Sequence, residues 1–174
     1  KTKTVYGDET ANNTFPIYWI DGDKVQVFSP QCLEGRRSAE YKVILPSGVT
    51  NHYYAEDLAK TGEYGVQWGN NETADFYSLY PSGNYTLSSD GTKAESITIG
   101  YTQSINVNGT TVKSDMEDCL MYAKTTGVPK GQIVNLRYDP ISTVIMLTLK
   151  VAANETGTNA DSFTIQTISL IADT

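Results

Sequence analysis

The sequence predicts an all-β protein, an antiparallel β-sandwich of about seven or more strands with long loops and at most short helical turns. Short runs in which apolar and polar residues alternate recur along the chain, as strands with one buried face require. Turn residues separate these runs at intervals of roughly 8–15 residues. Twelve tyrosines, against four phenylalanines, and many threonines, serines and asparagines also favour a polar-surfaced β protein.

The longest apolar alternation is Gln132–Val151, which we expect at the centre of the fold. Asp139-Pro140 divides it into two strand-like runs. After this break, one face carries Ile141, Thr143, Ile145, Leu147, Leu149 and Val151. The run from Ile141 to Val151 would reach roughly 35 Å as a strand, at about 3.3 Å per residue, so it needs partner strands along its whole length.

The first half of the chain begins with a polar, extended lead-in over Lys1–Phe15. Short apolar or alternating runs then follow at Ile17–Ile20, Lys24–Phe28, Tyr41–Leu45 and Phe76–Tyr80, with a turn at Asp21-Gly22 and a stop at Pro81. The segment Asn51–Lys60 is the most typical of a helical turn, although it is too short to be stable without tertiary contacts.

The second half continues the same pattern. Further strand-like runs are Asn84–Ser89, Ile97–Val107 and Phe163–Ile171, with turns at Asp90-Gly91 and Asn108-Gly109. The run Asp118–Ala123 is compatible with helix or strand, and we favour a strand. Thr125–Gly131 is predicted to be a loop.

Length and charge bound the function. The chain has 174 residues, which suits a single domain over residues 1–174. A formal net charge of −7 argues against nucleic-acid binding, because a phosphate backbone requires a basic surface. No apolar run reaches the roughly eighteen residues of a membrane span. Cys32 and Cys119 permit one disulfide, but Cys119 lies in an apolar run and we favour a small buried thiol there.

No catalytic or metal-binding constellation is visible, so we predict a non-enzyme without metal or cofactor. His52 is the single histidine, and no G-x-S-x-G motif accompanies it. One histidine and two separated cysteines also lack the ligand spacing of a zinc site. The acidic groups are interpreted as solvated loops and turns; they are Asp21/Asp23, Glu56/Asp57 and Asp115/Glu117/Asp118.

Aromatic residues provide the one candidate binding feature. Trp68, Tyr53 and Tyr54 are candidate ligand-stacking residues, while core packing explains such side chains more often. Other aromatics considered with them are Trp19, Tyr77 and Tyr80. The tripeptide N-x-T, a glycan acceptor in eukaryotic secreted proteins, begins at Asn12, Asn71, Asn84, Asn108 and Asn154.

In their order along the chain, five segments resemble the fimbrillin family, the type V pilin subunits and related surface proteins of Bacteroidetes. They are TVYGDET at Thr4–Thr10, YWIDGDKVQVFSP at Tyr18–Pro30, FYSLYP at Phe76–Pro81, DCLMYA at Asp118–Ala123, and VNLRYDPISTVIMLTLKV with the later SFTIQTISLI. The chain departs from the family at Asp139, where a histidine often stands.

The resemblance implies a transthyretin-like β-sandwich that is exported to the cell surface and outer membrane as a lipoprotein precursor. It implies proteolytic removal of an N-terminal segment and assembly with other fimbrial subunits by donor-strand exchange. Fimbrillins usually carry a second β domain, so this chain is expected to correspond to the N-terminal domain, without its C-terminal partner. The sequence does not specify which edge accepts a donor strand; the terminal elements, before Ile17 and at Phe163–Ile171, are the candidates. The alternative function is a non-polymerising cell-surface module that binds glycan or host protein.

Overall fold

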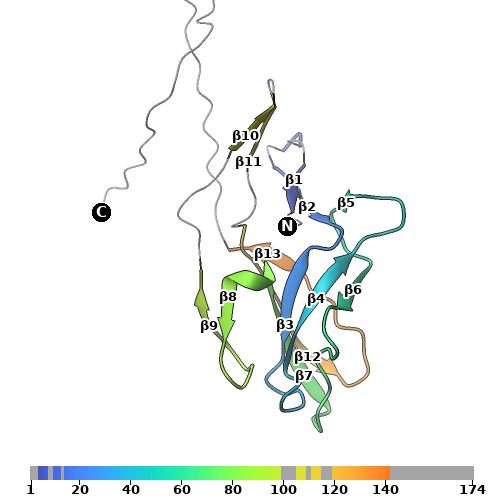
Figure 1. Ribbon diagram of the computed structural model, residues 1–174. Helices are drawn as coiled ribbons and strands as arrows, with labels where there is room; N and C mark the ends of the chain where they lie inside the picture. The colour runs from blue at the N-terminus through green and yellow to red at the C-terminus, as the bar shows by residue number, and fades with distance from the viewer. Residues whose placement is uncertain are drawn as a thin grey trace, which may run out of the picture. The chain divides into compact units, whose positions relative to one another are not determined.

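A computed structural model describes residues 4–7, 10–12, 14–98, 105–108, 111–114 and 119–141 of the chain. Antiparallel strands dominate this part, which confirms the predicted all-β class (Figure 1). The strands are β1 (Val5–Tyr6), β2 (Ile17–Ile20), β3 (Lys24–Phe28), β4 (Ser38–Ile44), β5 (Asn51–His52), β6 (Asp57–Lys60), β7 (Thr73–Tyr80), β8 (Tyr85–Leu87), β9 (Ala94–Ile97), β10 (Ile105–Asn108), β11 (Thr111–Ser114), β12 (Met121–Pro129) and β13 (Tyr138–Pro140). A 3-10 helix, η1 (Ser82–Asn84), follows β7.

The main sheet has six strands in the order β13-β12-β7-β3-β4-β6. Strand β7 lies between β12 and β3, and its residues Phe76 and Leu79 are each about 5% exposed or less. The sequence pattern explains this position, because β7 is the longest apolar strand-like run of the first half and Pro81 ends it. The smaller sheets are β1-β2-β5, β8-β9 and β10-β11.

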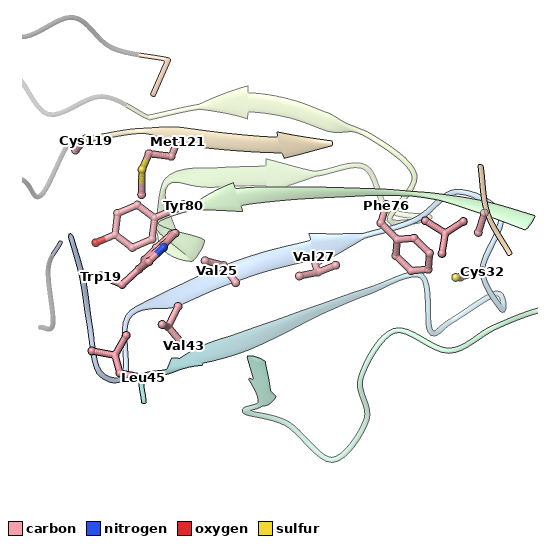
Figure 2. Close-up of a cluster of buried hydrophobic side chains, with 12 residues drawn as sticks. Trp19, Val25, Val27, Cys32, Val43, Leu45, Phe76, Tyr80, Cys119 and Met121 are labelled. Carbon is pink, nitrogen blue, oxygen red and sulfur yellow. The ribbon is translucent and has the colours of Figure 1, made fainter. Parts of the chain in front are cut away.

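One face of the main sheet forms the core. Alternate residues of its strands are buried on this face, as a period of two requires. They include Val25, Val27, Val43, Ala74, Phe76, Tyr80 and Met121 (Figure 2).

The layer over this core is only partly a sheet. Trp19 of β2 is 8% exposed and makes T-shaped ring contacts with Tyr80 at 5.2 Å and Tyr138 at 5.0 Å between ring centroids. Irregular segments contribute the other side chains packed on the core, among them Val66, Trp68, Val134 and Leu136. The second layer of the β-sandwich therefore combines the β1-β2-β5 sheet with irregular backbone.

The opposite face of the main sheet is also partly covered. Phe28 and Tyr77 are neighbours there, and their rings stack with centroids 5.4 Å apart. Ser82 of η1 donates a hydrogen bond to Glu40 Oε2 at 2.7 Å. A Cβ atom on Gly91 would come within 3.1 Å of the Ser38 hydroxyl, so the β8–β9 turn lies directly against β4.

The prediction of a helical turn over Asn51–Lys60 is wrong. This segment contains β5 and β6 instead, and β6 pairs with β4 so that Leu58 lies opposite Val43. The local sequence favours a helical turn only weakly, and pairing with an existing strand buries Leu58 beside the core.

One loop prediction is also corrected. Thr125–Gly131 was expected to be a loop, yet β12 continues to Pro129. Gly127 makes this continuation possible with φ of +64° at a bulge, where its N–H donates to Asp75 Oδ1 at 2.8 Å. The break expected at Asp139-Pro140 agrees with the structure, because β13 ends at Pro140, which pairs with Met121. Within the described part of the sheet β13 is an edge strand. A proline is tolerated on an edge strand because no neighbouring strand on the outer side requires a backbone N–H donor.

Some of the remaining predictions are confirmed, one is contradicted, and others concern residues that the structure does not describe. Lys24–Phe28, the Asp21-Gly22 turn and the strand character of Asp118–Ala123 are confirmed in whole or part. The run Ile97–Val107 is not one strand, because its ends belong to β9 and β10. Residues 142–151 and Phe163–Ile171 lie outside the described residues, so the central position of the long alternation and the single domain over 1–174 stay predictions.

Candidate functional site

The structure separates the three predicted ligand-stacking residues. Trp68 is partly buried and packs edge-on against the core ring of Phe76, with centroids 5.4 Å apart. Tyr53 and Tyr54 follow β5, whose His52 pairs with Trp19. Figure 2 shows Trp19 and Phe76 at opposite ends of the core. Trp68 is therefore a core-covering residue, and Tyr53 and Tyr54 do not share a surface with it.

His52, Tyr53 and Tyr54 form an exposed group of rings that we call the 52–54 cluster. The rings of His52 and Tyr53 are stacked with centroids 4.4 Å apart and an interplanar angle of 28°. Tyr54 stands nearly perpendicular to both, 4.1 Å from His52 and 5.0 Å from Tyr53. Tyr53 is 67% exposed and Tyr54 is 48% exposed. The sequence alone favours a loop or short-helix interpretation of His52, and the two tyrosines that follow it are the signal that its ring belongs with theirs.

The polar atoms of the cluster are only partly engaged. His52 Nδ1 lies 3.3 Å from both the backbone nitrogen and the carbonyl oxygen of Tyr54. This local contact holds the imidazole against its own loop. Among the described residues, no carboxylate or nucleophile approaches His52 to form a catalytic arrangement.

A second group of polar residues is buried. Asp23 is 0% exposed; its Oδ2 accepts a hydrogen bond from the Ile20 N–H at 2.9 Å, and its Oδ1 accepts one from the Tyr80 hydroxyl at 3.4 Å. The Tyr80 hydroxyl in turn accepts the Thr4 N–H at 3.0 Å. Burial, and then the negative charge of Asp23, raise the pKa of Tyr80. The solvated-loop interpretation of Asp21/Asp23 is thus wrong for Asp23, whose carboxylate closes a turn inside the protein.

A cavity of about 400 Å³ lies between residues 34–38 and 89–91. Its charged lining residues are Glu34, Arg37 and Asp90. Hydrogen bonds from the hydroxyls of Ser88 and Thr92 hold the pKa of Asp90 at about 2. Asp90 therefore stays ionised and is used by its own turn, which does not suit it to proton transfer.

Of the other two acidic groups, the structure describes only Glu56 and Asp57. Glu56 and Asp57 are exposed, as solvated residues should be, whereas residues 115–118 lie outside the described residues. Within the part of the chain that the structure describes, no group of three or more His, Cys, Asp or Glu side chains is arranged to hold a metal ion.

The structure does not bring the two cysteines together. Cys32 lies near Phe76 at one end of the core, and Cys119 lies near Met121 and Tyr80 at the other (Figure 2). Both are buried, and no disulfide joins them. The disulfide prediction is therefore not met in this structure, and burial of small apolar side chains accounts for both residues.

Comparison with known proteins identifies no relative: no family model, no curated protein and no solved structure matches this sequence. The described residues also contain no helix that is long and apolar enough to cross a membrane.

Proposed function

We propose that this protein is a structural or adhesive subunit of a bacterial surface fimbria, assembled by donor-strand exchange after proteolytic removal of an N-terminal segment. Its partners are other subunits of the same fimbria, and it reaches the outer surface as a lipoprotein precursor. The ordered resemblance to fimbrillins suggests this function. The observation that supports it best is the way in which the N-terminal residues complete the β1-β2-β5 sheet.

The N-terminal strand is attached by few interactions. β1 pairs with β2 at two positions, Val5 with Tyr18 and Tyr6 with Ile17. The N–H of Gly7 donates to the carbonyl of Pro16 at 2.7 Å, just beyond the strand. Such a short pairing contributes little stability by itself, so the segment is suited to removal.

Thr4 extends this attachment into the core. It is 1% exposed, and its backbone N–H donates to the buried Tyr80 hydroxyl at 3.0 Å. Its own Oγ1 is buried without a hydrogen-bond partner among the described residues, which costs free energy. The segment therefore covers a buried site but fits it imperfectly.

Loss of residues up to Gly7 would change two features of the sandwich. It would uncover the Tyr80 hydroxyl and leave β2 with an unpaired edge. An extended segment of another subunit could restore the backbone pairing and cover the same site. Because the donor and acceptor surfaces differ, each added subunit leaves a new acceptor, and the product is a filament.

The test is controlled cleavage of the 174-residue chain. A protease site placed in the turn at Thr10–Asn12 allows the N-terminal segment to be cut from the folded protein. We expect the cut protein to form filaments in a concentration-dependent manner, visible by light scattering and electron microscopy. The matched control carries the same site in the exposed turn at Ser47–Gly48, where cleavage leaves β1 attached.

Persistence of monomers after release of the N-terminal segment would contradict the proposal. It would favour the alternative function, a surface module that binds glycan or host protein without polymerising. Polymerisation of both cleaved proteins would also contradict it, because the cause would then be nicking in general rather than removal of β1.

A further inference from the structure

The 52–54 cluster is the largest concentration of exposed aromatic surface among the described side chains. Tyr53 is 67% exposed and Tyr54 is 48% exposed. Apolar surface of both rings therefore remains in contact with water, although its burial would be favourable. Adjacent exposed rings of this kind typically mark a binding surface, because tyrosine presents a large apolar face and a polar hydroxyl at a small cost in conformational entropy.

The cluster is joined by backbone pairing to a strand that packs on the core. His52 pairs with Trp19, and Asn51 pairs with Ile20, so β5 continues the sheet formed by β2. Trp19 is itself packed between the rings of Tyr80 and Tyr138. The mutual contacts of the three cluster rings, all between 4.1 and 5.0 Å, restrict their rotation further. A surface preorganised in this way loses little entropy when a ligand binds.

The local charge limits the class of ligand. Residues 49–59 contain no lysine or arginine, while Glu56 and Asp57 are exposed beside the cluster. Within this segment, an anionic ligand such as a sulfated or sialylated glycan would meet two carboxylates and no lysine or arginine. The three rings also contact one another and so enclose no space for a cation, unlike an aromatic cage.

We propose that the 52–54 cluster is a binding site for a neutral carbohydrate. A pyranose ring has a face of C–H groups and a rim of hydroxyls. The C–H face would stack on the open side of the Tyr53 ring, because His52 covers the other side. The imidazole and the tyrosine hydroxyls would then bond the sugar hydroxyls.

This site is independent of the strand exchange proposed above. In the β1-β2-β5 sheet, β1 and β5 occupy opposite edges of β2. Removal or replacement of β1 would therefore leave the cluster and its backbone pairing in place. The carbohydrate proposal can fail while the assembly proposal stands, and the reverse is also true.

The experiment is binding of the 174-residue chain to an array that carries neutral, sialylated and sulfated glycans together with a lysine-rich peptide. We expect binding to neutral glycans, and saturation-transfer NMR should show the strongest transfer to C–H protons on one face of a bound sugar. Tyr53→Ala and Tyr54→Ala should each weaken binding about tenfold. Tyr53→Phe should retain most of the binding, because it keeps the ring.

The matched control is Tyr64→Ala. Tyr64 is a similarly exposed tyrosine, 43% exposed, but the Arg36 guanidinium lies over its ring at 3.7 Å. This variant should bind as the parent does, and circular dichroism should show that all variants remain folded. The proposal is overturned if no neutral glycan binds, if sulfated glycans or the lysine-rich peptide bind better, or if Tyr53→Ala and Tyr64→Ala have the same effect.

Discussion

Asp23 joins the turn after β2, strand β4 and the core ring of Tyr80. Its side chain accepts hydrogen bonds from the Ile20 N–H and the Tyr80 hydroxyl. Its backbone N–H donates to the Ile20 carbonyl at 3.0 Å, and its carbonyl accepts the Val43 N–H at 2.7 Å. A buried carboxylate is tolerated only where donors surround it, and here they also fix the direction in which β3 begins.

Replacement of this carboxylate should be costly. Asp23→Ala leaves the Ile20 N–H and the Tyr80 hydroxyl without this acceptor, so we expect a loss of about 2–4 kcal/mol in the free energy of unfolding. Urea denaturation followed by circular dichroism measures the change. Asp139→Ala is the control, since Asp139 is exposed and its contact with Arg137 is long at 3.9 Å. Equal stability of the two variants would refute this account of Asp23.

At the scale of elements, the irregular segment 61–72 covers the core, as a strand would in a regular sandwich. The Val66 N–H donates to the Tyr41 hydroxyl at 2.8 Å, and Gln67 exchanges backbone hydrogen bonds with Leu33 and Arg36. Gly65 permits this close passage, because a Cβ atom there would lie 2.5 Å from the Tyr41 hydroxyl. The segment thereby holds Trp68 on Phe76.

Trp68→Ala tests this structural role. We expect a loss of about 2–3 kcal/mol in unfolding free energy, because the substitution removes a large ring from the core boundary. We expect no change in carbohydrate binding under conditions where the protein remains folded. Chemical denaturation and the glycan array measure the two effects separately. Loss of glycan binding without loss of stability would return Trp68 to the binding surface.

At the scale of the whole molecule, buried tyrosines should make the protein less stable at high pH. Burial raises the pKa of Tyr41, Tyr80, Tyr85 and Tyr138 above the usual value for tyrosine. The hydroxyl of Tyr85 donates to the Tyr80 carbonyl at 2.7 Å, and that of Tyr138 is hydrogen-bonded with Ser78. The folded protein therefore retains these protons at a pH where the unfolded chain releases them.

The sign of the effect follows from this difference. Below about pH 10 both states are protonated, and the stabilisation is fully present. As the pH rises above about 10, the unfolded state loses protons first, so the free energy of unfolding should fall. Denaturant titrations between pH 8 and pH 12, approximate limits chosen to bracket the usual tyrosine pKa, measure this fall. A stability that stays constant across that range would contradict the burial of these hydroxyls.

Much of the fold was predictable because local alternation of apolar and polar residues indicates many of its strands. The alternation of Val25 and Val27 with polar neighbours, and the run that ends at Pro81, place β3 and β7 correctly. Errors occurred where a distant partner decided the conformation. Asn51–Lys60 pairs with β2 and β4, and β12 extends across Gly127 because β7 lies beside it.

The candidate site was predictable only in part. Tyr53 and Tyr54 could be selected as aromatic residues in a polar segment, but Trp68 looked equally suitable from its sequence context. Burial decided between them, and burial depends on what the remainder of the chain places above each ring.

The sequence by itself determined the all-β class and the main turns, because these depend on periodicities of two and on local backbone preferences. The tertiary structure alone decided that Asp23 is inside, that Trp68 covers the core, and that His52, Tyr53 and Tyr54 meet at the edge of a sheet. Each outcome depends on a partner far away in the chain, namely Tyr80 for Asp23, Phe76 for Trp68 and Trp19 for His52, and the residues next to each position do not specify that partner.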